Sequence, residues 1–400
     1  MKAFVKYLLF VLCFVTLEAG AQESVSINAI DLDTNADRNK KEIFNLWKSY
    51  LESVANEDTV LKEWNSIDKQ QYVSPDFLSS EGFLSPGLYG LYKMGYLNKV
   101  LEIAPLLEDP ARYMIRSMFY APLENDTYIL AITRHIAAKE DDEYKLFNWT
   151  PYHTRNWIRK TVGRIHYIYY PEFEFDELNA EKANGLIDLF RDKLGTNIPD
   201  SITYYIAQNC DEIQKLKGFD YVITMGDNVC NVCGFTDRVN HIIYAERTHG
   251  ENYQHELTRL INPSFPNAHY YIIQGLAEYF NTSDGQLGIT RKEIFKIMDQ
   301  WLKEHPKEDI INEQSEFHTM NNQVAPDYSI GMIICHSLYE KGGYKLLKEA
   351  LIAGNDDDSF FSFLNNKIGV NQKNFNKWIR GQISRYVNED FPSLQTGSNY

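Results

Sequence analysis

The stretch that decides the fold is Glu251-Asn-Tyr-Gln-His-Glu-Leu-Thr-Arg-Leu-Ile-Asn262, which Pro263 follows. Its apolar residues recur at helical spacing and fall on one stripe: Tyr253, Leu257, Leu260 and Ile261. His255 and Arg259 are four residues apart, so on a helix they project together from the opposite side, with Glu256 beside them. The stretch therefore predicts a helix whose apolar back is buried and whose polar face lines a cleft.

A second segment, Ile272-Ile-Gln-Gly-Leu-Ala-Glu-Tyr-Phe280, follows with 18 residues between Arg259 and Glu278. Together the two segments resemble the motifs of gluzincin-type, peptidase MA-like zinc metallopeptidases. In that class His-Glu-x-x-His on one helix and Gly-Leu-Ala-Glu-Tyr on a later one supply the zinc ligands. The segment Tyr328-Ser-Ile-Gly331 is similar to the later helix whose tyrosine faces the reacting group.

The resemblance implies a role for each matching residue. It makes His255 and Glu278 zinc ligands, and Glu256 the general base for a metal-bound water. It makes Tyr328 the hydrogen-bond donor to the oxyanion. The chain departs from the pattern at one position, because Arg259 stands where the second histidine belongs.

The arginine changes what the site is expected to do. A guanidinium keeps its protons in proteins, so Arg259 has no lone pair for a metal. We expect its side chain to neutralise Glu278 or Glu256 through a charge-assisted hydrogen bond, and zinc, the only cofactor implied, not to bind. His269, which precedes Glu278 in the chain, is a possible substitute ligand.

Three functional hypotheses follow. The first is a pseudopeptidase that keeps the cleft to bind a peptide or protein. The second is an active zinc-dependent peptidase that uses a substitute ligand. The third is a non-enzymatic scaffold protein of the cell envelope, in which the two helices are structural only.

The first residues predict export. Lys2 and Lys6 precede an apolar run at 7–17 that is too short to span a bilayer, and Ala19-Gly-Ala21 supplies small residues for cleavage. We therefore expect residues 1–21 to be a signal peptide and the protein to be periplasmic or extracellular. No later run is long and apolar enough to predict a transmembrane segment.

The net charge limits the classes of binding partner, and the cysteine content bears on the compartment in which the protein functions. The formal net charge of −15 argues against nucleic acid, whose binding depends on dense Lys and Arg. Cysteines in an exported chain are compatible with disulfides, and the candidates are Cys210, Cys230 and Cys233. We expect a structural bridge or buried thiols there, because no second Cys-x-x-Cys follows to complete a metal site.

The order of patterns predicts an α+β protein with two domains. Residues 22–38 are polar and aperiodic, and we expect a flexible lead-in. We expect an N-terminal α+β domain at 39–170, with helices followed by a curved antiparallel sheet. At 171–391 we expect a gluzincin-like domain with a small sheet and a mostly helical C-terminal part.

Individual elements are predicted inside these domains. We expect helices at 42–55, around 86–102 and at 180–194, and strands at the following β-rich runs: 113–120, 128–133, 144–149, 157–170, 202–207 and 241–245. Thr290 and Glu293 are spaced as a capping box. Gly342-Gly343 is expected to end a helix.

Overall fold

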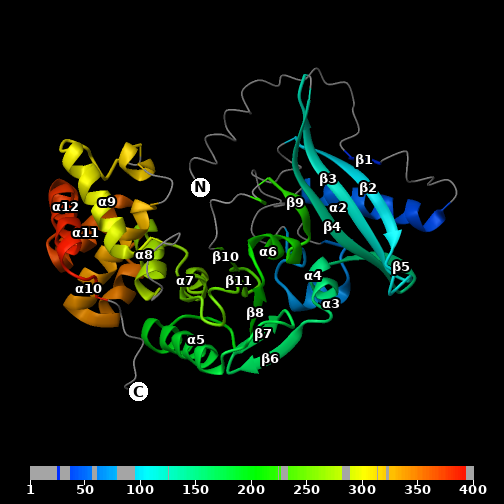
Figure 1. The fold of residues 1–400 in the computed structure, drawn as a ribbon, viewed down its shortest axis with the longest axis horizontal. Coiled ribbons are helices and arrows are strands. Elements are labelled where there is room, and N and C mark those ends of the chain that lie inside the picture. Colours follow the sequence, from blue (N-terminus) through cyan, green and yellow to red (C-terminus); the bar gives the residue numbers. More distant parts are fainter. Residues whose placement is uncertain are drawn as a thin grey trace.

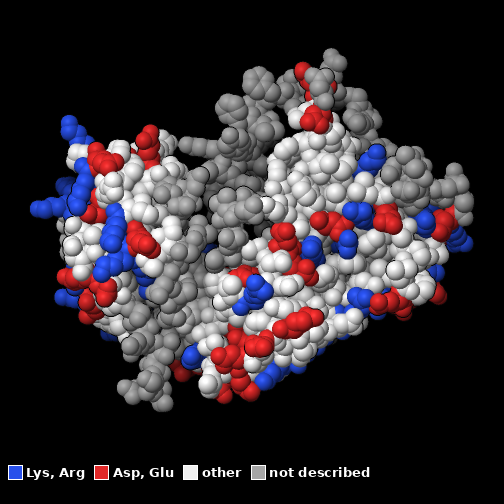
Figure 2. Space-filling model, in the orientation of Figure 1, with Lys and Arg blue, Asp and Glu red and all other residues white. Residues whose placement is uncertain are grey.

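The computed structural model describes residues 25–27, 37–55, 61–78, 95–124, 126–223, 225–226, 233–281, 289–312, 314–320 and 324–392. The predicted signal peptide at 1–21 lies outside the described residues. Within them, every helix is too short or too polar to pass through a lipid bilayer. Figure 1 shows helices α9 to α12 gathered at one end of the molecule, and the first sheet with α2 at the other. On the face in Figure 2, acidic and basic side chains are interspersed over both ends.

The first sheet has strand order β1-β2-β3-β4-β5, with β9 paired to β4. Its strands are β1 (Val25–Ile27), β2 (Leu97–Pro105), β3 (Tyr113–Pro122), β4 (Thr127–Glu140), β5 (Glu143–Phe147) and β9 (Phe219–Val222). Neighbouring strands are antiparallel, except that β1 is parallel to β2. Since β1 lies within the predicted lead-in, that part of the lead-in is paired in the sheet.

One face of this sheet is covered by helix α2 (Arg38–Ala55). The helix buries a row of large side chains against the strands: Ile43, Trp47, Tyr50 and Leu51. Because side chains alternate along a strand, Ile115 and Phe119 of β3 reach this core, while their neighbours face the other side. Two short helices, α3 (Ser66–Gln71) and α4 (Trp149–His153), flank the sheet.

The second sheet has strand order β10-β11-β8-β7-β6. Its strands are β6 (Ile158–Val162), β7 (Ile165–Tyr169), β8 (Ile202–Ala207), β10 (Gly234–Asp237) and β11 (Ile242–Glu246). Strands β7, β8 and β11 run parallel, and the two edge strands run antiparallel to their neighbours. The β6–β7 hairpin, expected in the first domain, is therefore hydrogen-bonded into this second sheet. Helices α5 (Glu177–Leu189), which continues as a π-helical turn (Phe190–Leu194), and α6 (Cys210–Leu216) accompany the sheet.

Helices make up most of the rest of the described chain. They are α7 (Gln254–Arg259), α8 (Tyr270–Phe280), α9 (Arg291–Glu304), α10 (Pro326–Leu351), α11 (Asp357–Ile368) and α12 (Gln372–Asn388), with 3-10 turns at Asn262–Ser264 and Glu316–Thr319. The capping box at Thr290 and Glu293 is confirmed. Gly342 and Gly343 leave helical geometry and split α10 into two helices across a kink, as the sequence predicted.

One predicted helix is wrong. Residues 79–94 lie outside the described residues, but Leu97–Pro105, expected to be partly helical, forms strand β2. Buried Asn98 and Val100 alternate with more exposed neighbours, which is the pattern of a strand. Pairing with β1 and β3 outweighs the local helix preference of the leucine, lysine and glutamate residues here.

Candidate functional site

Helix α7 carries the first candidate residues. It covers only Gln254–Arg259, fewer residues than predicted, and a 3-10 turn follows at Asn262–Ser264. Its apolar stripe is almost fully buried in the main core: Leu257, Leu260 and Ile261. The side chains of His255 and Arg259 are partly exposed, at 14% and 22%. The buried back therefore fixes the direction in which both polar side chains project.

Helices α8 and α10 cross where each has a glycine. A Cβ added at Gly275 would lie 2.1 Å from the carbonyl carbon of Gly331, so the two backbones touch at this point. Glu278 lies three residues after the first glycine, and Tyr328 lies three residues before the second. Both side chains therefore lie within one turn of the crossing. Because α8 also packs on α7, the three helices bring their polar residues together.

The guanidinium of Arg259 is the centre of the site. Its Nε donates a hydrogen bond to Nε2 of His255 at 3.2 Å, and its Nη2 donates to Oη of Tyr328 at 2.9 Å. A longer contact of 3.4 Å joins Nη2 to Oε1 of Gln274. The arginine therefore connects α7 to both α8 and α10. Gln274 was not singled out from the sequence, although it lies four residues before Glu278 and so on the same helix face.

The expected hydrogen bond from Arg259 to a carboxylate is wrong. Its Nε lies 3.8 Å from Oε2 of Glu256, which is an ion-pair distance and too long for a hydrogen bond. Instead, Oε2 of Glu256 accepts from the hydroxyl of Thr236 on β10 at 2.6 Å. Thr236 carries no signal in the sequence, because only the packing of the edge strand on α7 brings it there.

Glu278 has a different cationic neighbour, Arg291. The carboxylate is nearly buried, at 2% exposed, and its Oε1 lies 3.9 Å from Nε of Arg291, whose Nη2 also donates to the Glu278 carbonyl at 2.7 Å. The other oxygen, Oε2, lies 3.8 Å from Nδ1 of His255. The sequence analysis did not identify Arg291 as a site residue. Its place in the first turn of α9 was a usable signal, because the helix dipole disfavours a cation there and a carboxylate partner elsewhere is then expected.

The charge states of the site follow from burial. Burial lowers the pKa of Arg259, but the charge of Glu256 and the hydrogen bond to Tyr328 raise it more, so the net shift is upward. Burial, with the nearby carboxylates, raises the pKa of Tyr253. His249, stacked on Tyr253 with ring centroids 3.5 Å apart, has its pKa lowered by burial to about 4. The site therefore holds two guanidinium cations, Arg259 and Arg291, beside the neutral rings of Tyr253 and His249.

His269 is not brought to the site. It caps the N-terminus of α8, where its Nδ1 accepts a hydrogen bond from the Tyr271 amide, and its Nε2 lies 3.0 Å from the Asp357 carboxylate. Its ring stacks on Phe360 at 3.8 Å between centroids. Glu278 lies nine residues further along α8, which is about 13 Å along the helix axis. This geometry gives His269 a structural role in capping the helix.

The residues present do not fit a zinc site. Nε2 of His255 accepts a hydrogen bond from Arg259, so its lone pair already has a donor, and the proton of a neutral ring is then on Nδ1, facing Glu278. In the part of the chain that the structure describes, no three His, Cys, Asp or Glu side chains are grouped to hold a metal. The arrangement is a hydrogen-bonded network around a cation.

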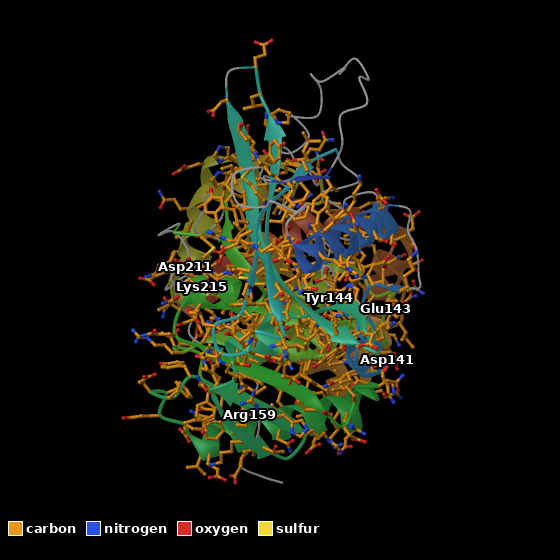
Figure 3. The ribbon with its side chains drawn as sticks, turned by 90° about the vertical axis from the view of Figure 1, so that its right-hand side faces the viewer. Asp141, Glu143, Tyr144, Arg159, Asp211 and Lys215 are labelled. Atoms are coloured by element: carbon orange, nitrogen blue, oxygen red, sulfur yellow. A yellow bond between two sulfur atoms is a disulfide. The ribbon has the colours of Figure 1, made fainter. Side chains whose placement is uncertain are left out.

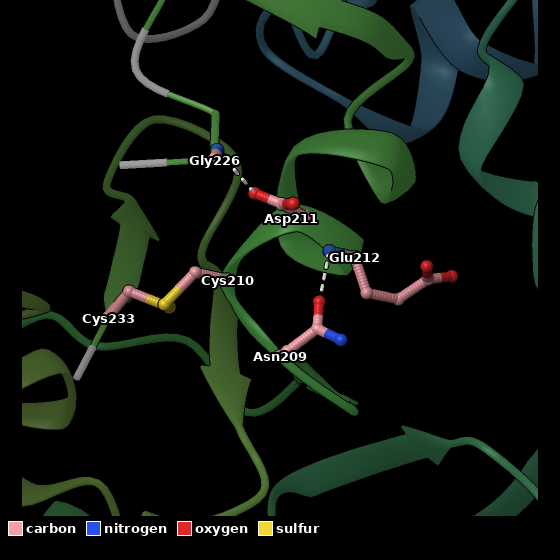
Figure 4. Close-up of a disulfide and its surroundings, with 6 residues drawn as sticks. All are labelled: Asn209, Cys210, Asp211, Glu212, Gly226 and Cys233. Atoms are coloured by element: carbon pink, nitrogen blue, oxygen red, sulfur yellow. Dashed lines mark hydrogen bonds between the residues drawn. A yellow bond between two sulfur atoms is a disulfide. The ribbon is translucent and has the colours of Figure 1, made fainter. Parts of the chain in front are cut away.

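Two of the candidate cysteines form a disulfide bridge between α6 and the start of β10. Cys210 at the start of α6 is disulfide-bonded to Cys233 beside β10, and Figure 4 shows the bridge with Asn209 capping the helix through the Glu212 amide. Cys230, the third candidate, lies outside the described residues. Cys335 is a buried thiol on α10. The bridge ties α6 to the edge of the second sheet.

Among known proteins, the chain has a distant likeness to a solved structure. No protein-family model matches the chain, and no curated protein matches it. Among solved structures, the fold is similar to an aminopeptidase N family protein from Idiomarina loihiensis, with 14% sequence identity and a TM-score of 0.34. The match covers 70% of this chain and 55% of that chain, so it spans about half of the other structure. A likeness at this level assigns the chain to no family.

Proposed function

We propose that this protein is an exported pseudopeptidase: a gluzincin-like cleft that binds an extended peptide and does not hydrolyse it. The observation that carries the proposal is the position of the Arg259 guanidinium. It contacts His255, Glu256 and Tyr328, the groups that the motif resemblance would assign to a metal, its water and the oxyanion. A fixed positive charge therefore takes the place of the cation and its water.

The chemistry of these residues also argues against hydrolysis. A general base must be free to take a proton from an activated water. Glu256 already accepts a hydrogen bond from Thr236, and a permanently charged guanidinium lies 3.8 Å away. Tyr328 accepts a hydrogen bond from Arg259. A guanidinium neither polarises a water as a metal does nor exchanges its proton, so the water would stay unactivated.

Peptide binding is favoured by the strand beside the site. In the second sheet β10 is an edge strand, and it packs closely on α7, because a Cβ at Gly234 would lie 2.1 Å from the Tyr253 ring and 3.1 Å from Glu256. An edge strand offers backbone N–H and C=O groups to an extended partner. The side chains of His255 and Arg259 lie on the adjacent helix, where they would contact that partner.

The first experiment separates a pseudopeptidase from an active enzyme. The purified protein is dialysed against dilute zinc, its metal content is measured, and a casein digest is incubated with it and followed by mass spectrometry. We expect well under one equivalent of zinc and no new cleavage products. Stoichiometric zinc with cleavage would establish the active-peptidase hypothesis instead.

The second experiment separates a peptide-binding protein from a scaffold. Hydrogen exchange is measured by mass spectrometry with and without the same casein digest. We expect slower exchange in β10, because its outward amides become paired. Strand β6, at the opposite edge of the same sheet, is the matched control and should not change. Equal exchange in both strands with and without peptide would favour the scaffold hypothesis.

A further inference from the structure

Two arginines face each other on the first sheet, far from the helices of the candidate site in the chain. Arg116 of β3 and Arg134 of β4 are direct partners in the strand register. Ile115 and Phe119 belong to the core under α2, so Arg116 between them projects from the other face. Figure 3 shows α6, marked by Lys215, on the opposite side of these strands from α2. Like charges directly opposite on paired strands repel, so this pair requires an anion.

Asp220 of β9 supplies part of that anion. Nε of Arg116 lies 2.5 Å from one oxygen of its carboxylate, and Nε of Arg134 contacts the other oxygen. The carboxylate is only 10% exposed. In the part of the chain that the structure describes, the Nη nitrogens of both arginines donate no hydrogen bond. The Asp220 carboxylate therefore contacts both guanidinium groups through their Nε atoms. The Nη nitrogens of both arginines remain able to donate hydrogen bonds to a ligand.

The two arginines line a cavity of about 250 Å³ together with Trp149, His153, Lys215, Phe219 and Asp220. The guanidinium carbon of Arg134 lies 5.0 Å from the ring centroid of Trp149, which fixes the plane of its fork. Lys215 adds a third cation, and its Nζ lies 3.8 Å from Glu212.

The cavity keeps a positive balance. His153 holds Glu212 as a carboxylate, because its hydrogen bond lowers the pKa of that residue. Arg116, Arg134 and Lys215 thus face two carboxylates, those of Asp220 and Glu212, in a chain whose net charge is −15. Glu102, opposite Arg116 on β2, makes no ion pair with it among the described residues. A local excess of positive charge in so acidic a protein is what an anion site requires.

We propose that this cavity binds a tetrahedral oxyanion, namely a phosphate or sulfate group. Two opposed guanidinium forks present four amino groups, which match an anion with three or four oxygens better than a carboxylate with two. The volume lies below the roughly 300 to 1,000 Å³ of sites for drug-sized molecules, so the cavity takes a free ion or one group of a larger molecule. This inference is independent of the proposed peptidase-like cleft.

The test is a titration of the purified protein with inorganic phosphate at constant ionic strength, with sodium chloride as the balancing salt. Binding is followed by tryptophan fluorescence, since Trp149 lines the cavity, and by the melting temperature, which rises when a ligand binds the native state. Sulfate and glucose 6-phosphate are titrated in the same way. Tighter binding of glucose 6-phosphate than of phosphate identifies a group on a larger molecule, and weaker binding identifies a free ion.

Variants locate the site. Arg116→Lys and Arg134→Lys keep the charge that faces Asp220 but remove one fork, so each should weaken phosphate binding at least tenfold. Arg112→Lys, at an exposed arginine paired with Asp109, is the matched control and should bind as wild type does. Phosphorus NMR line broadening of phosphate with wild type provides a readout that does not depend on variant folding. No saturable response beyond that of chloride, or equal binding by all three variants, would overturn the proposal.

Discussion

Arg259 donates its Nε hydrogen to Nε2 of His255 at 3.2 Å, across one turn of α7. The contact joins the two residues that the motif resemblance places at zinc-ligand positions. It leaves Nη2 of the arginine to reach Tyr328 on α10 at 2.9 Å. One side chain thus fixes the tautomer of the histidine and bridges two helices, which makes the arginine a structural element of the site.

Truncating this arginine should destabilise the protein. In Arg259→Ala, buried Glu256 loses its nearest cation and Tyr328 loses its donor. We expect a loss of about 1 to 3 kcal/mol, the usual cost of leaving a buried polar group without a partner. Urea unfolding measures it. Arg385→Ala, which removes an exposed ion pair with Glu389, is the control and should cost about 0 to 1 kcal/mol. Equal losses in both variants would show that Arg259 contributes no more than a surface charge.

The close contact between α8 and α10 predicts that a larger residue at position 275 destabilises the protein. In Gly275→Ala the new methyl would lie 2.1 Å from the Gly331 carbonyl carbon, and no rotamer change can relieve a clash with backbone. We expect a loss of about 1 to 3 kcal/mol or more, because α8 and α10 must move apart. Gly185→Ala, at an exposed position of α5 with nothing within 4 Å, should instead stabilise by about 0.5 to 1 kcal/mol. A stable Gly275→Ala protein would contradict the close crossing.

The sequence predicted on which helix face the site residues lie, but it did not predict which residues they contact. Spacing of four residues and an apolar stripe suffice to put His255 and Arg259 on one side of a helix, because helical geometry is local. The same spacing rule applies to Gln274 and Glu278 on α8. Thr236 and Arg291 could not be placed in this way, since strand β10 and helix α9 reach the site only through tertiary packing.

The length and type of some helices and strands were also hard to predict, because contacts distant in sequence decide them. The apolar spacing continues past Arg259 to Leu260 and Ile261, but the backbone tightens into a 3-10 turn that includes Pro263. Leu97–Pro105 contains helix-forming residues, yet two neighbouring strands pair with it. In both cases the deciding partner lies outside the local window.

A histidine outside the site predicts a pH dependence. Nδ1 of His318 lies 2.6 Å from the Asp327 carboxylate at the start of α10. Burial lowers the pKa of His318, but the hydrogen bond and charge of Asp327 raise it more, so the folded pKa lies above the ordinary value. A group with a raised folded pKa binds protons more tightly in the native state. Its stabilisation is therefore full below the unfolded pKa, about 6.5, and is lost as the pH rises through the folded value.

The expected result is a stability gap between wild type and His318→Gln that is largest near about pH 5 to 6 and shrinks in alkaline solution. Urea unfolding at several pH values measures the gap. The exposed His166→Gln variant corrects for loss of a solvent-facing imidazole. A gap that widens with rising pH would mean that the ion pair with Asp327 does not stabilise the native state.

On the proposed function, a histidine at position 259 should create metal binding. Arg259→His removes the donor that occupies Nε2 of His255 and supplies a second imidazole four residues along α7, with Glu278 still at 3.8 Å from His255. Two imidazoles, one carboxylate and a water are a sufficient ligand set for zinc. Arg291, 3.9 Å from Glu278, stays as a competing cation, so we expect weaker binding than in an intact peptidase site.

The measurement is zinc content after dialysis against dilute metal, together with the melting temperature as zinc is added. Wild type should hold well under one equivalent, and Arg259→His should approach one and melt at a higher temperature, because zinc binds the native state. The matched control is the double variant Arg259→His, Glu278→Gln, which keeps both imidazoles but loses the carboxylate ligand and should bind much less. Stoichiometric zinc in wild type would refute the pseudopeptidase proposal.

If neither wild type nor Arg259→His binds zinc, two contacts keep the carboxylates bound to protein partners instead of a metal. They are the ion pair of Arg291 with Glu278 and the hydrogen bond from Thr236 to Glu256, and both are the next contacts to change. Peptide hydrolysis is a stricter outcome than metal binding, since Glu256 must also be released from Thr236 to act as a base.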